Sequence, residues 1–211
     1  MKKQHIGWIA GTAAAVLVAA GAITYAVAED GGGGSGPGVP SADGADAGFA
    51  RDMAVHHQQA VEMSYIVRDR TKNADVRRLA YDIAQTQANQ RGMLLGWLDL
   101  WDLPKVSAKP PMAWMGMGDM PERGDGSLMP GMATDTELKK LGTLNGKQAE
   151  VFYLQLMTDH HKGGIHMAEG CVAKCTVEVE KNLAQGMVDA QQSELATMKQ
   201  MLTERGAKPR D

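Results

Sequence analysis

The stretch MAVHHQQAVEM at residues 53–63 recurs 104 residues later as MTDHHKGGIHM at residues 157–167. Both copies place Met, His, His and Met at the same four positions, and together they contain five of the chain's six histidines. Between residues 49–98 and 153–202 only eight positions are identical, and four of these are the shared Met and His positions. What the repeat preserves is therefore chemical, and it divides the chain into two related halves.

Apolar residues around each copy recur at spacings of three and four, which is the pattern of one face of a helix. Asp46 and Asn73 are placed to cap the first two helices, while Pro104 and Gly206 are placed to end the second and the fourth. Thr134 begins a capping-box pattern that opens a short additional helix. The pattern predicts long helices over residues 49–70, 74–103, 147–173 and 176–205.

The connections within each half are short, so each half should form an antiparallel helical hairpin. Neither hairpin can bury its apolar stripe alone, so the two should pack face to face. We therefore expect an all-α fold without strands, a four-helix bundle made of two tandem hairpins. A long Met-rich crossover at residues 104–133 joins them, and a loop of about this length is typically functional or disordered.

The N-terminus has the composition of a targeting segment, with Lys2 and Lys3 followed by an apolar run and a small-x-small cleavage pattern. The alternative is an uncleaved membrane anchor, because residues 6–27 approach the roughly 20 residues that span a bilayer. Either interpretation places the rest of the chain outside the cytoplasm. The expected parts are a leader at 1–28, a Gly-rich flexible linker at 29–48, the bundle at 49–205 and a tail at 206–211.

Several function classes are disfavoured. The net charge is −3 and the basic residues are scattered, which gives no electrostatic case for nucleic-acid binding. Nothing is typical of a Ser/His/Asp or Cys/His catalytic set, a phosphate loop or a nucleotide fold. The Glu-x-x-His pattern of di-iron carboxylate bundles is absent, because Tyr65 and Val172 follow Glu62 and Glu169 at that spacing. Binding is therefore more strongly indicated than catalysis.

The repeated motif indicates a metal site. Residues three and four apart share a helix face, so Met53, His56 and His57 should project together, as should their counterparts in the second copy. Imidazole binds several transition metals, whereas thioether sulfur favours Cu(I) or the similar Ag(I). We therefore expect copper, with Cu(I) favoured over Cu(II), and no organic cofactor. The expected ligands are first His56, His57, His160 and His161, and then Met53, Met63, Met157 and Met167.

An alternative remains for each of these residues, because buried histidines are commonly hydrogen-bonded core residues and methionine is a common core filler. Asp52 and Asp159 could orient an imidazole, although solvation is the favoured interpretation. His166 is balanced between ligand and surface residue. Met112, Met115, Met117 and Met120 lie among Gly and Pro in the crossover, where they form either an exposed thioether array for Cu(I) or a loop packed over the bundle end.

Cys171 and Cys175 are the only cysteines, and they lie four residues apart near the end of the third long helix. A disulfide is the default in an exported protein, and it would require the helix to break between them. The alternative is a pair of thiolates beside His166 and Met167.

These motifs resemble the DUF305 family of exported helical proteins. The matching pieces are the two Met/His motifs, the Met129-Pro-Gly-Met132 turn and the Gln/Glu-rich closing helix, over about residues 49–205. The resemblance implies a ferritin-like four-helix bundle and, as in some members, copper binding in metal homeostasis or resistance. The partners expected are a metal ion and a protein that exchanges copper with it, with membrane contact only through residues 6–27.

Two other functions remain open. One is a metal-dependent oxidoreductase on the same bundle, and the other is a structural or interaction module of the cell envelope with no metal. Oligomeric state is not predicted.

Overall fold

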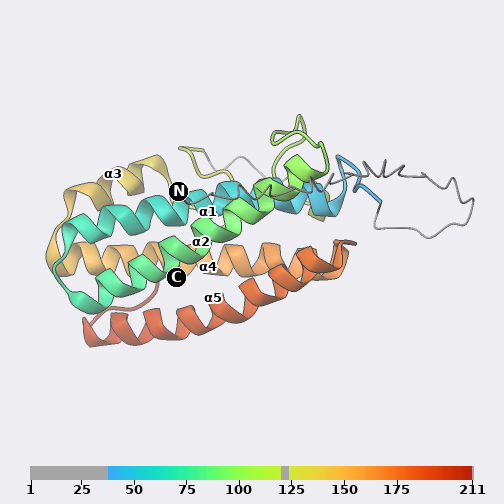
Figure 1. Ribbon diagram of the computed structural model, residues 1–211. Coiled ribbons are helices and arrows are strands. Elements are labelled where there is room, and N and C mark those ends of the chain that lie inside the picture. The colour runs from blue at the N-terminus through green and yellow to red at the C-terminus, as the bar shows by residue number, and fades with distance from the viewer. Residues whose placement is uncertain (1–37, 120–123, 211) are drawn as a thin grey trace, which may run out of the picture. The chain divides into compact units, whose positions relative to one another are not determined.

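The computed structural model describes residues 38–119 and 124–210 of the 211-residue chain. The expected leader, part of the expected linker and Met120 lie outside the described residues. Within them there is no strand, and no helix combines the length and apolarity needed to cross a membrane. Figure 1 shows α1 (Ala45–Arg70), α2 (Ala74–Leu100), the 3-10 turn η1 (Ala113–Met115), α3 (Asp135–Thr143), α4 (Gly146–Lys174) and α5 (Glu178–Glu204).

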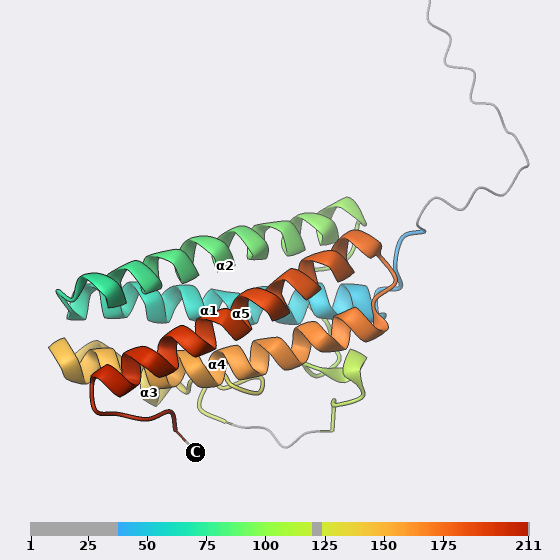
Figure 2. The ribbon, with the colours of Figure 1, turned by 90° about the horizontal axis from the view of Figure 1, so that it is seen from below.

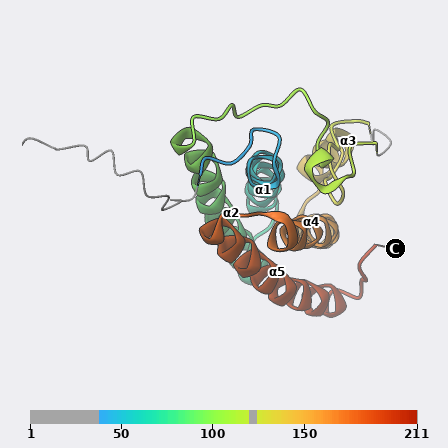
Figure 3. The same cartoon turned by 90° about the vertical axis from the view of Figure 1, so that its right-hand side faces the viewer.

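The two repeat helices, α1 and α4, form the centre of the bundle. α1 runs between α2 and α4, and α4 pairs with α5 (Figure 2). α1 and α4 run in opposite directions, and the crossover leads from α2 to the side of the bundle where α3 lies (Figure 3). The predicted all-α four-helix bundle of two hairpins is therefore confirmed.

Three predicted helix ends are confirmed. The Asn73 side chain accepts hydrogen bonds from two backbone N–H groups in the first turn of α2, the shorter at 3.0 Å. Thr134 and Glu137 form the reciprocal capping box that opens α3. Gly206 follows α5 with a φ of 66°, a left-handed conformation that glycine adopts without strain.

Asp46 does not cap α1, contrary to expectation. It lies inside α1, whose N-cap is Gly44. Its carboxylate instead accepts hydrogen bonds from the backbone N–H groups of Thr176 and Val177, both at 2.8 Å. These groups lie at the start of α5, where the N-cap residue Val177 has no side-chain acceptor. The cap therefore comes from another helix, which a local pattern cannot reveal.

Two predicted boundaries are also wrong. α1 begins at Ala45, so residues 45–48 belong to the helix and not to the linker. α2 ends at Leu100, before it reaches Pro104. Asp102 adopts a φ of 53°, and Leu103 donates its backbone N–H back into the last turn of α2 at 2.9 Å. This closing hydrogen bond, rather than the proline, ends the helix.

The apolar core forms two clusters. The first contains Met53 from the start of α1 and Met167 from the end of α4, and the second contains Met63 and Met157 from the opposite ends. On both helices the histidine pair lies between the two methionines in sequence. The antiparallel crossing of α1 and α4 therefore places a polar layer between two apolar ones.

The crossover packs closely against α4 at the turn of residues 129–133, and substitutions at glycine can test this contact. A Cβ added at Gly163 would lie 2.0 Å from the backbone oxygen of Pro130, whereas one at Gly92 on α2 would meet nothing within 4 Å. We expect Gly163→Ala to lower the free energy of unfolding by about 1–3 kcal/mol through overpacking. Gly92→Ala should raise it by about 0.5–1 kcal/mol, because alanine favours helix. Urea denaturation measures both, and equal effects would contradict the packing described.

Candidate metal centre

The four repeat histidines, here called the histidine layer, meet where α1 crosses α4. His56 and His57 lie on α1, His160 and His161 lie on α4, and all four side chains are fully buried. The rings of His56 and His160 lie against each other, with centroids 3.7 Å apart and planes tilted by 32°. The Nε2 of His160 also donates to the backbone oxygen of His56 at 3.0 Å. The structure thus brings one histidine from each copy into direct contact.

The two outer histidines lie farther from this pair. The ring centroids of His57 and His56 are 6.5 Å apart, and those of His161 and His160 are 6.4 Å apart. His161 donates from Nε2 to the carboxylate of Glu194 on α5, at 2.6 Å. Nδ1 of His161 makes no hydrogen bond to a described residue, and carboxylates commonly orient a metal-binding imidazole by such a bond to its other nitrogen.

Sequence analysis missed Glu194. It lies 104 residues after Gln90, whose side chain lies beside His57, so the two residues occupy matching positions in the repeat. Because they differ in type, the comparison of identical positions did not single out Glu194. The two acids considered for this role have other partners. Asp52 accepts a hydrogen bond from a backbone N–H of the crossover at 2.8 Å, and Asp159 pairs with the C-terminal tail at 2.7 Å.

Most nitrogens of the histidine layer have no hydrogen-bond partner. Both ring nitrogens of His56 and His57, and the Nδ1 atoms of His160 and His161, make no hydrogen bond to any residue of 38–119 or 124–210. The carbonyl of Pro130 lies beside His56, but without hydrogen-bond geometry. Buried polar atoms are nearly always paired, because an unpaired one costs about 1–3 kcal/mol. Six such atoms in one layer therefore fit a centre that binds a ligand.

The buried rings are held neutral. Burial, with a smaller contribution from the neighbouring imidazoles, lowers the pKa of both His56 and His57 to about 3. Burial and the nearby imidazoles also bring the pKa of His160 well below its usual value. A neutral imidazole has one nitrogen lone pair free for a metal, so these three rings can coordinate without first losing a proton.

The layer is not already arranged around one point. Among residues 38–119 and 124–210, the only three His, Cys, Asp or Glu donors that lie within 4.8 Å of one another are Cys171, Cys175 and Glu180. The lone pair of an imidazole lies in the plane of its ring, whereas His56 and His160 meet face to face. An ion shared between them therefore requires their rings to turn. The His56 ring makes no hydrogen bond that opposes this rotation, whereas the His160 ring would give up its hydrogen bond to the backbone oxygen of His56.

The predicted methionine ligands lie on both sides of the histidine layer. Met53, Met63, Met157 and Met167 are all fully buried. They divide into one pair in each apolar cluster, with one methionine from each copy. Each pair can therefore offer two thioethers to the same side of the layer.

The remaining predicted ligands among the described residues lie outside the histidine layer. His166 is exposed and lines an open groove of about 760 Å³. Met112 is fully buried, and Met115 and Met117 are half-buried against the first apolar cluster. The expected exposed thioether array is therefore wrong for Met112, and the alternative of a loop packed on the bundle end describes these three residues.

The turn at residues 129–133 closes over the centre. Gln59 on α1 holds it with two hydrogen bonds to one backbone unit, at 2.7 and 2.9 Å. Gly163 allows it to approach α4 closely. Met129 and Met132, which sequence analysis used only for the resemblance, are buried in the same cluster as Met53 and Met167. These two methionines flank a Pro-Gly pair, which is typical of a tight turn, and this was the only sign in the sequence that they are held at a fixed place.

Cys171 and Cys175 form a disulfide with a Cα–Cα distance of 4.8 Å. α4 ends between them at Lys174, as the disulfide interpretation required. The thiolate alternative does not describe this state of the protein.

Comparison with known proteins gives a family and a set of related folds. The model of the DUF305 family, "Domain of unknown function (DUF305)", matches residues 46–202. The crystal structure of "putative secreted protein DUF305" from Streptomyces coelicolor is 71% identical, with a TM-score of 0.76, and the match covers 81% of this chain and 99% of that one. A DUF305 fragment from Deinococcus radiodurans is 28% identical, with a TM-score of 0.63 and coverage of 80% and 99%.

A more distant fold match is CopM in its Cu(I)-bound form. It is 20% identical, with a TM-score of 0.58, and the match covers 75% of this chain and 96% of that one. No curated protein matches the chain.

The low pKa of the buried histidines predicts acid sensitivity of the metal-free protein. A histidine with a pKa of about 3 when folded and about 6.5 when unfolded stabilises the fold above pH 6.5, and this contribution is lost as the pH falls toward 3. We expect His57 alone to remove about 2 kcal/mol between pH 7 and pH 5. His57→Gln should lose correspondingly less stability over this range in urea denaturation. The exposed His166→Gln should behave as the wild type, and identical behaviour of all three proteins would contradict the neutral buried ring.

Proposed function

We propose that this chain, which belongs to the DUF305 family, is an extracytoplasmic protein that binds Cu(I) or a similarly soft ion at the histidine layer. The observation that carries the proposal is the set of six buried imidazole nitrogens without partners. Neutral imidazoles between two thioether pairs are the donors that a soft monovalent ion prefers. His56 and His160 are the first ligands, His57 and His161 are the next, and the four repeat methionines complete the set.

The solved relatives support the choice of metal. CopM has been solved in Cu(I)-bound, Cu(II)-bound and Ag-bound forms, and it shares the fold of this chain. CopM is only 20% identical to this chain, so the proposed ligands rest on the residues of this chain and not on those of CopM. A role in metal homeostasis or resistance, in which copper is stored and passed to a partner protein, follows from the proposal.

Location outside the cytoplasm rests on two observations. The sequence begins with a targeting pattern, and the Streptomyces coelicolor relative is described as secreted. The disulfide agrees with an oxidising compartment.

The direct test is titration of the protein with Cu(I) in competition with a chromogenic Cu(I) chelator. We expect the double variant His56→Gln/His160→Gln to bind at least about tenfold more weakly than the wild type, equivalent to about 1.4 kcal/mol. His166→Gln, on the same helix but exposed, is the matched control and should bind as the wild type. Cu(I) should also raise the melting temperature of the wild type by more than that of the double variant. Equal affinity of wild type and double variant would reject the histidine layer as the site.

The thioethers can be tested without disturbing the packing. Replacing Met53 and Met167 by leucine removes both sulfurs from one side of the layer and should cost less than about 1.5 kcal/mol of stability. We expect this variant to bind Ag(I) and Cu(I) more weakly in the same competition assay. Met198→Leu, which changes a fully buried methionine outside the two Met/His motifs, should leave affinity unchanged. If both variants retain wild-type affinity, the methionines only fill the core.

A further inference from the structure

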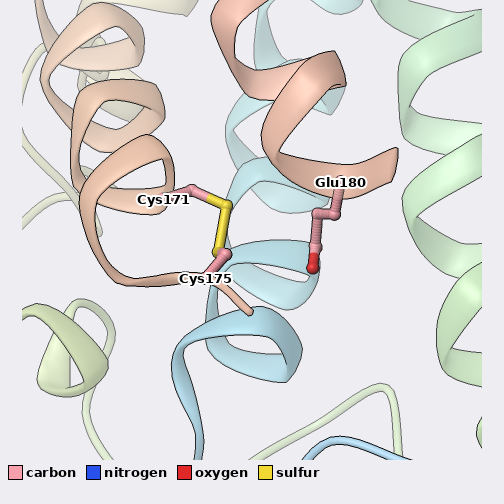
Figure 4. Close-up of side chains that lie close together, drawn as sticks. All are labelled: Cys171, Cys175 and Glu180. Carbon is pink, nitrogen blue, oxygen red and sulfur yellow. A yellow bond between two sulfur atoms is a disulfide. The ribbon is translucent and has the colours of Figure 1, made fainter. Parts of the chain in front are cut away.

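The α4–α5 end of the second hairpin holds a group of donors that the histidine layer does not use. The sulfurs of Cys171 and Cys175 and a carboxylate oxygen of Glu180 lie within 4.8 Å of one another, and all three residues are buried. Figure 4 shows the Glu180 side chain reaching from the first turn of α5 toward the side of the disulfide. Three metal-binding groups therefore converge where the chain passes from α4 to α5.

Glu180 is not explained by the packing of the bundle. It is fully buried, and neither carboxylate oxygen accepts a hydrogen bond from a described donor. The one polar side chain that pairs with it is another acid, Asp46, to which a protonated Glu180 donates, while the oxygens of Asp46 also accept the N–H groups at the start of α5. Burial, and then the charge of Asp46, raises the pKa of Glu180 to about 9, so the group is a neutral acid beside the disulfide. Such a group is costly to bury, and valine would fill the space without that cost.

The first hairpin shows that this end of a hairpin can be built from ordinary residues. Thr71 follows α1 in the same way that Cys175 follows α4, and each donates its backbone N–H into the last turn of its helix. Val67 and Val76 stand in the first half where the second half has its other cysteine and Glu180, and both are fully buried. Hairpin closure therefore does not account for two cysteines and a glutamate at this end.

We propose that Cys171, Cys175 and Glu180 form a redox-gated binding site for a divalent metal ion of the zinc type. Two thiolates and a carboxylate are donors that Zn²⁺ accepts together, whereas Cu(I) favours sulfur without a carboxylate. The disulfide is the closed state of the site. The cysteines lie at the carbonyl end of α4, which attracts a cation, and Glu180 lies at the N–H end of α5, which stabilises its charge.

Opening the site requires two electrons, and a dithiol reductant supplies them. One thiolate of the reductant attacks the disulfide at Cys175, which is 5% exposed while Cys171 is fully buried. This attack releases the Cys171 thiolate and leaves the reductant bonded to Cys175. The second thiol of the reductant then attacks the reductant's own sulfur in this mixed disulfide and releases Cys175, so two cysteine thiols remain and the reductant is oxidised to its cyclic disulfide. Binding of one divalent ion to the two thiols and the Glu180 carboxyl group releases three protons.

The test uses the full chain reduced anaerobically with dithiothreitol, freed of reductant by gel filtration, and titrated with Co²⁺ as a spectroscopic substitute for Zn²⁺. We expect a near-ultraviolet thiolate-to-cobalt charge-transfer band that saturates at one equivalent and is removed by Zn²⁺. The oxidised protein should show no such band. The band should persist in His56→Gln/His160→Gln, which separates this site from the proposed copper site.

Three variants define the ligands. Cys171→Ser/Cys175→Ser should lose the band, and Glu180→Gln should bind Co²⁺ at least about tenfold more weakly. Glu178→Gln, in the same turn of α5 but exposed, is the matched control. Glu180→Val introduces the residue that the first hairpin has at the matching position, Val76. This variant should therefore fold fully, but it should bind Co²⁺ more weakly than the wild type. Any one of three results overturns the proposal: no band after reduction, equal affinity of wild type and both Glu180 variants, or reduction only when the circular dichroism signal of the helices is lost.

Discussion

The contact between the rings of His56 and His160 is the interaction around which this bundle is built. It brings α1 and α4 together where a bundle of this kind would ordinarily place apolar side chains. Glycines on α4 support the contact, because Gly163 admits the turn at residues 129–133 and Gly164 admits the side chain of Gln191. The result is a buried polar layer between two apolar clusters, and its unpaired nitrogens are a cost to folding that metal binding would offset.

The two halves share a backbone plan and the Met/His motif, but the residues around that motif differ in chemistry. Glu194 accepts a hydrogen bond from His161, whereas the corresponding residue in the first half is the uncharged Gln90. The ends of the hairpins differ more strongly, since valine and threonine in the first half are replaced by a disulfide and a buried carboxyl group in the second. The shared motif thus supplies the symmetric contact at the centre, and the differences outside it place the buried carboxyl group and the disulfide in the second hairpin.

Sequence reasoning succeeded where the cause was local or periodic. The spacing of apolar residues predicted the four helices, and the caps at Asn73 and Thr134 follow from side chains that bond within their own turn. It failed where the partner came from another part of the chain. Asp46 caps α5 rather than its own helix, and Met112 is buried because Asp52 on α1 binds its backbone N–H.

The features of the candidate site likewise divide into those with a local cause and those that depend on distant parts of the chain. Adjacent histidines on a helix can be read directly, but whether two such pairs touch depends on the crossing of α1 and α4. The face-to-face arrangement of His56 and His160, and the link from His161 to Glu194, arise only from the packed bundle. The resemblance to DUF305 correctly indicated the family, while the ligand set remains a proposal.

The most direct measurement is a crystal structure of the Cu(I)-loaded protein with anomalous data collected at the copper absorption edge. The account predicts an anomalous peak bound by ring nitrogens from both α1 and α4, with the rings of His56 and His160 turned out of their face-to-face contact. Copper found only at exposed positions such as His166, with the histidine layer unchanged, would contradict it.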